Sequence, residues 1–199
     1  MNENTKVTLS DGELAIAMDK EFILTKRIII EKVAMLFNEQ INIVSDIMKE
    51  SILMLPEVSA AVPKISKGEN YNGLPYVMFD YPHVFEKENI FALRTFFWWG
   101  NFFSISIQLS GKYKAYFEEN IFKKLSKGDW FVCVNENEWQ HHFEDSNYKF
   151  FTLLTEAERA SLKLKGFIKI ALKYKLHHWN MMQQLLPQGY KKINDLLLP

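Results

Sequence analysis

Cysteine is almost absent from this 199-residue sequence, in which Cys133 is the single example. An intrachain disulfide and a zinc site made of several thiolates are therefore excluded. Residues 1–4 show no basic stretch leading into an apolar one, and no window reaches the ~18 uninterrupted apolar residues that a membrane span requires. We expect a cytoplasmic protein that does not bind a membrane.

Net charge is missing as well, because 24 basic residues balance 24 acidic ones. The balance is uneven along the chain: residues 1–62 carry 6 basic and 10 acidic side chains, whereas residues 163–199 carry 7 and 1. Without an overall field, the chain has no general attraction for polyanions. We expect no nucleic acid as a partner, and we expect the lysines of the basic tail to form a solvated face.

Four common signatures of catalysis and nucleotide binding are missing: the Gly-x-Ser-x-Gly elbow, the His-Glu-x-x-His helix, the Rossmann Gly-x-Gly-x-x-Gly turn and the Walker loop. Gly68 and Gly73 have the spacing of a phosphate-binding loop. However, Leu74 and Pro75 stand where a lysine and a hydroxyl residue would bind phosphate and magnesium. No cofactor is expected, and the sequence leaves open whether the protein is an enzyme.

Apolar residues are plentiful, at 48% hydrophobic and 15% aromatic, and a chain of this length can bury one sizeable core. We expect a single domain over residues 1–199. Ser10 followed by Glu13 is typical of a helix start, and one or two helices are expected over residues 11–53. Their apolar positions recur at helical spacing: Leu14, Phe22, Ile29, Val33, Phe37, Ile41, Val44 and Met48. Residues 56–75, rich in Pro and Gly, are expected to form an irregular connection.

Short alternating segments separated by turn residues follow, and short turns favour antiparallel pairing. Six strands are expected, at residues 76–81, 92–99, 102–109, 130–134, 139–144 and 148–154. One helix is inserted between the third and the fourth of them. The predicted fold is α+β, with an antiparallel sheet of about six strands within residues 76–154, flanked by N-terminal and C-terminal helices.

The C-terminal part, residues 155–199, is expected to be helical. Thr155 and Glu158 form a second capping-box pattern, which predicts a short helix. Apolar and basic positions then predict a longer helix at about 167–186 and a short closing helix at about 190–197.

The run from Arg94 to Leu109 predicts a β-hairpin, because Gly100-Asn101 is a signal for a two-residue turn. Such a turn fixes the register and places Trp99 opposite Phe102. One face is then aliphatic and aromatic and is the expected core face. The other face mixes aromatic and hydroxyl side chains, as ligand pockets do: Phe97, Trp99, Phe102, Thr95, Ser104 and Ser106. Alternatively, helices cover both faces and the hydroxyl groups satisfy one another.

This pattern favours a non-catalytic module that uses the mixed face to bind a small apolar or aromatic ligand or to interact with a partner. An enzyme is the alternative hypothesis, with a site built from Asp80, His83, Arg94 and His141, the ionisable residues expected on or beside the sheet. A third hypothesis is a homodimer whose interface is formed by exposed aromatic side chains.

Arg94 and Asp80 are each the lone charge in an apolar strand, and an unpaired buried charge is strongly destabilising. We therefore expect the two side chains to form a buried ion pair. The adjacent pairs His141-His142 and His177-His178 resemble metal ligands, but their neighbouring side chains are expected to point to different faces. No metal site is predicted, and His141 is expected to be a core histidine whose hydrogen bonds are satisfied.

Overall fold

The computed structural model describes residues 7–199 and shows an α+β fold in which an antiparallel sheet of seven strands is flanked by helices. The strands follow the order β1-β2-β3-β4-β7-β5-β6 across the sheet. The predicted fold class is confirmed, with one strand more than expected. The strands are β1 (Lys64–Tyr71), β2 (Leu74–Phe85), β3 (Ile90–Trp98), β4 (Phe102–Ser110), β5 (Phe131–Cys133), β6 (Tyr148–Phe150) and β7 (Phe167–Lys175).

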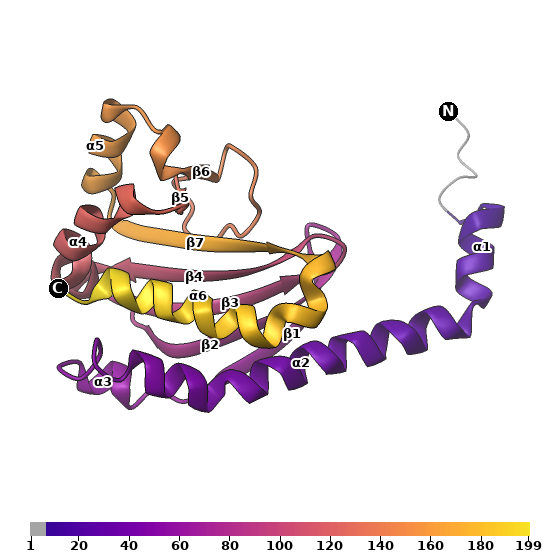
Figure 1. The fold of residues 1–199 in the computed structure, drawn as a ribbon. Helices are drawn as coiled ribbons and strands as arrows, with labels where there is room; N and C mark the ends of the chain where they lie inside the picture. The colour runs from indigo at the N-terminus through magenta and orange to yellow at the C-terminus, as the bar shows by residue number, and fades with distance from the viewer. Residues whose placement is uncertain (1–6) are drawn as a thin grey trace.

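Helices lie at both ends of the chain and after β4. They are α1 (Asp11–Met18), α2 (Lys20–Met48), α3 (Pro56–Ser59), α4 (Gly111–Lys124), α5 (Glu156–Leu164) and α6 (Met182–Leu197). Figure 1 shows α2 and α6 running across one face of the sheet, where they contact each other. It also shows α1 and the first part of α2 projecting beyond the sheet, and α1 has no buried residue.

Both predicted capping boxes are present. The side chain of Ser10 accepts a hydrogen bond from the N–H of Glu13, whose carboxylate accepts one from the N–H of Ser10. Thr155 and Glu158 make the same pair of bonds at the start of α5. Each box satisfies two donors, one of them among the N–H groups that a helix start leaves unpaired, which explains where α1 and α5 begin.

The predicted helix over residues 167–186 is wrong, because residues 167–175 form strand β7 between β4 and β5. Lys169 and Lys173 are four residues apart, and that spacing fits one face of a helix and one face of a strand equally well. The alternation of Lys169 with Ile168 and Ile170 is the strand signal, and tertiary pairing with β4 decides in its favour.

Three further segments differ from the expectation. Residues 56–75 contain α3 and β1, and the two-residue turn Asn72-Gly73, with positive φ at both positions, joins β1 to β2. Residues 139–144 form no strand, because their backbone groups bond to side chains, among them the hydroxyl group of Tyr71. Pro187 lies inside α6, so the closing helix predicted from residue 190 is part of a longer one.

The pairing of β3 with β4 is shifted by one residue from the predicted register. Trp98, and not Trp99, lies opposite Phe102, because three residues ending at Asn101 connect the strands. The N–H of Trp99 instead donates to the carbonyl oxygen of Pro75. A shift of one residue moves the side chains of one strand to the opposite face relative to those of its partner. The predicted division of the hairpin into a core face and a mixed face is therefore wrong.

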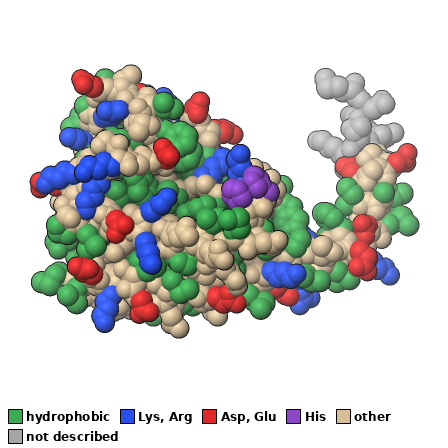
Figure 2. All heavy atoms as spheres, viewed as in Figure 1, with side chains coloured by type: hydrophobic (Ala, Val, Ile, Leu, Met, Phe, Trp, Pro, Cys, Tyr) green, Lys and Arg blue, Asp and Glu red, His purple; other side chains and the backbone are tan. Residues whose placement is uncertain are grey.

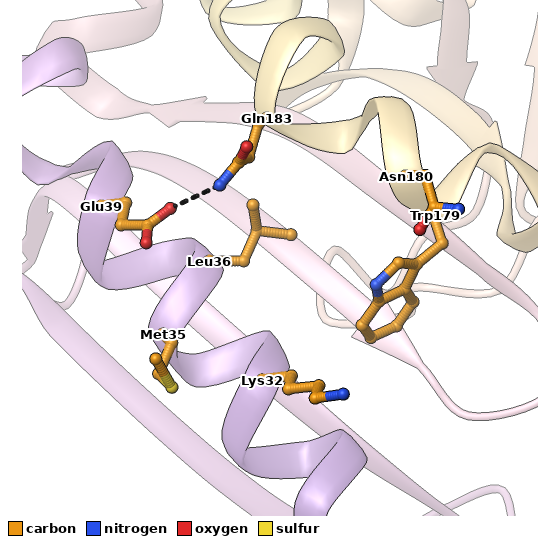
Figure 3. A pocket seen from close by; sticks show the side chains of 7 residues that line it. All are labelled: Lys32, Met35, Leu36, Glu39, Trp179, Asn180 and Gln183. Carbon is orange, nitrogen blue, oxygen red and sulfur yellow. Dashed lines mark hydrogen bonds between the residues drawn. The ribbon is translucent and has the colours of Figure 1, made fainter.

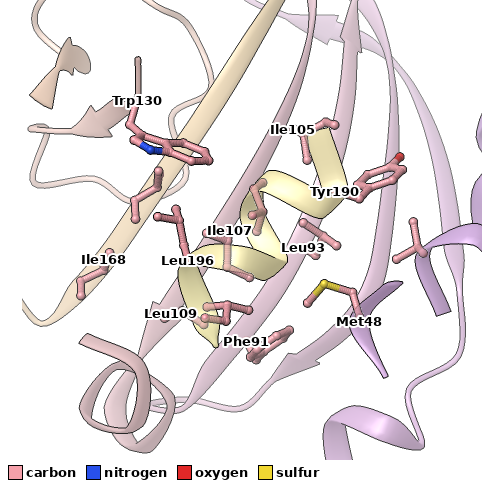
Figure 4. Close-up of a cluster of buried hydrophobic side chains, with 14 of the residues drawn as sticks. Met48, Phe91, Leu93, Ile105, Ile107, Leu109, Trp130, Ile168, Tyr190 and Leu196 are labelled. Carbon is pink, nitrogen blue, oxygen red and sulfur yellow. The ribbon is translucent and has the colours of Figure 1, made fainter. Parts of the chain in front are cut away.

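One face of the sheet, called here the helix face, forms the main core together with α2, α4 and α6 (Figure 4). Side chains from the central strands meet there: Phe91, Leu93, Phe97, Phe103, Ile105, Ile107, Leu109, Ile168 and Ile170. Tyr190 of α6 and Met48 of α2 join this cluster. The opposite face, called here the second face, carries a separate aromatic cluster around Phe96, Trp98 and Phe102.

We predict that Gly189→Ala destabilises the protein, because side chains of the sheet pack directly against α6 at this position. An added methyl group would overlap the hydroxyl group of Tyr174 and the side chain of Ile105. Overpacking of this kind costs about 1–3 kcal/mol. Gly166→Ala is the matched control, because nothing lies within 4 Å of its added methyl group. Urea unfolding of both variants checks the prediction, and equal unfolding midpoints would contradict it.

Candidate functional site

The six residues predicted to line one mixed pocket are distributed over both faces of the sheet. The helix face carries Thr95 and Phe97, and the second face carries Phe102, Ser104 and Ser106, all of them at most 5% exposed. The half-buried Trp99 lies at the turn, with its ring 6.4 Å from that of Phe97. The hydroxyl group of Thr95 shares a hydrogen bond of 2.8 Å with that of Tyr190, so it is satisfied inside the core.

The residues proposed for the alternative site do come together, around Arg94 on the second face. Nε and Nη2 of Arg94 donate to the two carboxylate oxygens of Asp80, over 2.6 and 3.0 Å. Nη1 of Arg94 lies 3.2 Å from Nε2 of His141. Nδ1 of His83 lies 3.1 Å from the backbone carbonyl oxygen of Asp80. The buried Asp80–Arg94 pair is thus confirmed.

His141 belongs to residues 135–147 between β5 and β6, called here the covering segment, which packs against the second face. The ring of His141 lies 5.0 Å from that of Phe96. The ring of Phe143 lies 5.0 Å from that of Phe102. The hydroxyl oxygen of Tyr71 accepts hydrogen bonds from the backbone N–H groups of His141 and His142. The covering segment therefore closes this face.

Lys169 of β7, which the sequence pattern placed on a solvated face, completes the cluster and is only 2% exposed. Its Nζ lies 2.6 Å from the carbonyl oxygen of Glu138, 2.7 Å from that of Gln140 and 3.4 Å from Nδ1 of His141. Arg94 can only donate, so Nε2 of His141 must accept and Nδ1 of a neutral ring carries the proton. Nδ1–H then needs an acceptor, and a neutral lysine amine provides one lone pair beside its two N–H donors.

The electrostatics of the cluster agree with this assignment. Burial lowers the pKa of Lys169 to about 7, and the charge of Arg94 acts in the same direction, whereas Cys133 and Glu138 oppose it. Burial, together with the charges of Lys169 and Arg94, holds the pKa of His141 well below its ordinary value. His141 is therefore neutral at pH 7, and Lys169 becomes neutral as the pH rises above about 7.

Solvent and substrates have little access to this cluster. Asp80, Arg94 and His141 are 4%, 7% and 8% exposed, and the covering segment lies over them. A substrate could reach the titratable groups only if residues 135–147 moved away. Within residues 7–199, no group of three or more His, Cys, Asp or Glu residues is arranged to hold a metal ion. The cluster is best explained as the bonds that fasten the covering segment to the sheet.

A second feature, which the sequence pattern did not single out, is the surface of the N-terminal arm, residues 7–28. Nine large apolar side chains in it are 46–90% exposed: Val7, Leu9, Leu14, Ile16, Met18, Phe22, Ile23, Leu24 and Ile28. Figure 2 shows hydrophobic side chains along these projecting helices. Large exposed apolar patches on proteins mark interaction sites.

The long helix α2 carries two apolar stripes on opposite sides. Val33, Phe37, Val44 and Met48 are fully buried against the sheet and α6, as their helical spacing predicted. Leu24, Ile28 and Met35 lie on the opposite side of the helix and are 50–63% exposed. A helix that is apolar on both sides is normally covered on both sides. The sequence signal for the second stripe was the spacing of these three residues.

Two hollows of ≈ 300 Å³ lie beside α2, at different positions along the helix. One lies between α2 and α6 and is lined by Lys32, Met35, Leu36, Glu39, Trp179, Asn180 and Gln183 (Figure 3). A hydrogen bond of 3.0 Å from Gln183 to Glu39 spans one end of it. The other hollow lies beside Trp99, Phe22 and Ile29. Both hollows adjoin the exposed apolar surface of α2.

No protein-family model, no curated protein and no solved structure matches the chain. Among the described residues, no helix combines the length and the apolar character needed to cross a bilayer. The choice between functions therefore depends on the chemistry of the two surfaces described above.

Removing one member of the Asp80–Arg94 pair should destabilise the protein more than replacing both. Arg94→Met leaves a buried carboxylate without its partner, which costs about 3–5 kcal/mol. The double variant Asp80→Leu/Arg94→Met removes both charges, and its loss should be clearly smaller than that of Arg94→Met. Guanidinium unfolding of the single and double variants measures the difference. Unchanged stability of Arg94→Met would show that the pair is not buried in solution.

The second prediction for the cluster concerns pH. Lys169 loses its proton near pH 7 in the folded protein but near pH 10.4 when unfolded, so between these values the unfolded state binds more protons. This contribution makes the folded state more stable as pH rises above 7, by up to about 1.4 kcal/mol per pH unit, and is constant below pH 7.

Lys169→Met is the variant that tests this dependence. Other groups that titrate above pH 7 are present in both proteins, so their contributions cancel when the two free energies of unfolding are subtracted. The stability difference between the native protein and Lys169→Met should therefore change with pH above 7 through Lys169 alone. Lys165→Met is the control, since it removes the bonds of Nζ to the carbonyl oxygens of Val134 and Asn135 but retains Lys169. A pH-independent difference for Lys169→Met would mean that Lys169 is charged in the folded protein.

Proposed function

We propose that the protein is a non-catalytic interaction module that binds another protein chain through its N-terminal arm and the adjoining surface of α2. The observation that carries this proposal is the exposure of nine large apolar side chains within residues 7–28. A helix as short as α1 is marginally stable in water without tertiary contacts, and α1 makes no buried contact within the chain. A partner would supply those contacts.

The two hollows support the same proposal. Trp179 and Trp99 each line one of the two hollows beside α2, and the ring centroid of Phe97 lies 6.0 Å from that of Trp179 and 6.4 Å from that of Trp99. This aromatic group gives α2 a firm support beside its exposed stripe. Large aromatic side chains are enriched in protein interfaces, where they contribute much of the binding energy.

The alternatives have less support from the geometry. A small-ligand pocket would need the mixed set of hairpin residues on one face, and the observed register separates them. An enzyme would need access to Arg94 and His141, which the covering segment encloses. We assign the module to the cytoplasm, because its single cysteine, Cys133, is buried and unpaired and needs no oxidising compartment.

A photo-crosslinking residue placed in the full-length protein tests the proposal. Leu24 is replaced by benzoylphenylalanine, and Leu164, an exposed residue at the end of α5, is replaced in the control. Irradiation of cells that produce the protein should give a discrete covalent adduct to a second chain from position 24 and none from position 164. Mass spectrometry then identifies the attached chain. Equal yields from both positions, or no adduct from position 24, would contradict an interface on the arm.

A further inference from the structure

The charged residues that border the exposed stripe of α2 can form ion pairs with those of a second copy of the same stripe. Glu21 and Lys32 lie on the same side of the helix, because 11 residues make close to three turns. Between them lie Leu24 and Ile28, both about half exposed. When two copies of this stripe run antiparallel, Leu24 of each faces Ile28 of the other, and Glu21 faces Lys32 at both ends. A parallel pair would place like charges opposite each other.

We infer that the chain bound by the N-terminal arm is a second copy of this protein, held by an antiparallel pair of α2 helices around a two-fold axis. This inference rests on the proposed function, since it names the partner of the same surface. In the dimer, Glu21 pairs with the partner subunit's Lys32, and the apolar residues between them are covered. Such an interface is isologous, so each favourable contact occurs twice.

The interface must extend beyond the seam itself. The seam from Glu21 to Lys32 is about 16 Å long, because each helical residue adds about 1.5 Å, whereas a standard interface buries roughly 800 Å² on each partner. Met35 and Lys32 border both the stripe and the hollow beside Trp179. The surface therefore continues from the seam into that hollow, where the partner's α1 completes the contact with its exposed apolar side chains. Fixed polar groups, such as the Gln183–Glu39 pair, border it.

A membrane surface is a poorer occupant of the arm. Residues 7–28 carry four carboxylates, from Asp11, Glu13, Asp19 and Glu21, against three basic side chains. Helices that bind anionic lipid have a predominantly basic polar face. In α1 the polar and apolar residues are also mixed around the helix, since it reads Asp-Gly-Glu-Leu-Ala-Ile-Ala-Met. A second chain can contact such a helix from several sides, whereas a bilayer surface contacts one.

Charge reversal tests both the partner and the orientation. Sedimentation velocity of the full-length protein over a wide concentration range gives the dimer dissociation constant of each variant. Glu21→Lys and Lys32→Glu should each weaken the dimer about tenfold, because two attractive pairs become repulsive. The double variant Glu21→Lys/Lys32→Glu restores both pairs and should return to within about threefold of the native value. Circular dichroism confirms that each variant folds.

Two further variants test whether the dimer depends on the apolar seam. Ile28→Asp places a charge in the centre of the seam and should leave the protein monomeric, whereas Leu164→Asp changes an even more exposed apolar residue elsewhere and should not affect the dimer. Failure of the double reversal to recover would overturn the antiparallel pairing. A native protein that is monomeric at all concentrations, with Leu24 crosslinked to a different protein, would overturn the second copy while the proposed function stood. Binding to vesicles of anionic lipid, without dimers, would overturn both.

Discussion

A guanidinium group buried in the middle of a sheet must be neutralised, and much of the second face follows from the way Arg94 meets that requirement. Asp80 provides the carboxylate, and a register irregularity in the pairing of β2 with β3 follows directly after it. The remaining nitrogen of Arg94 holds His141, which brings the covering segment onto the sheet. Nζ of Lys169 lies beside Nδ1 of the same ring and donates hydrogen bonds to two carbonyl oxygens of that segment. Four separate parts of the chain are thereby joined.

The sequence predicted those features that depend on neighbouring residues or on isolated charges. Both capping boxes are local patterns that needed no tertiary information. The Asp80–Arg94 pair was predictable because a lone charge in an apolar strand has few ways to be compensated. Asn72-Gly73 is an equally local hairpin signal, and it indicates the β1–β2 turn inside a segment that its Pro and Gly content made look irregular.

Features that depend on pairing across the sheet were not predictable in the same way. The spacing of the lysines in β7 fits a helix and a strand alike, and only the neighbouring β4 selects the strand. The β3–β4 connection has three residues because the N–H of Trp99 bonds to Pro75 of β2, a contact far away in the sequence. That one bond shifts the register, and the shift separates Phe97 from Phe102 and so divides the predicted pocket between two faces.

The apolar arm could not be told from the core for a different reason, because apolar residues recur at helical spacing without a break from residue 14 to residue 48. Val33 and Phe37 are buried, whereas Leu14 and Phe22 are about half exposed. Helical periodicity shows which residues share a side of a helix, and it gives no information on where the rest of the fold ends. The sheet ends before α2 does, and the position of that end is a tertiary property.

The continuity of α2 is what allows one helix to serve both the core and an interface. Its buried residues, from Val33 to Met48, fix the helix against the sheet and α6, so the first three turns leave the body in a fixed direction. A partner that binds those turns meets a helix that is already formed, and it orders few additional residues. The short helix α1 has no such anchor. Ordering α1 on binding would cost conformational entropy and so reduce the affinity. The seam on α2 therefore contributes most of the stability of the complex, and α1 adds contact area.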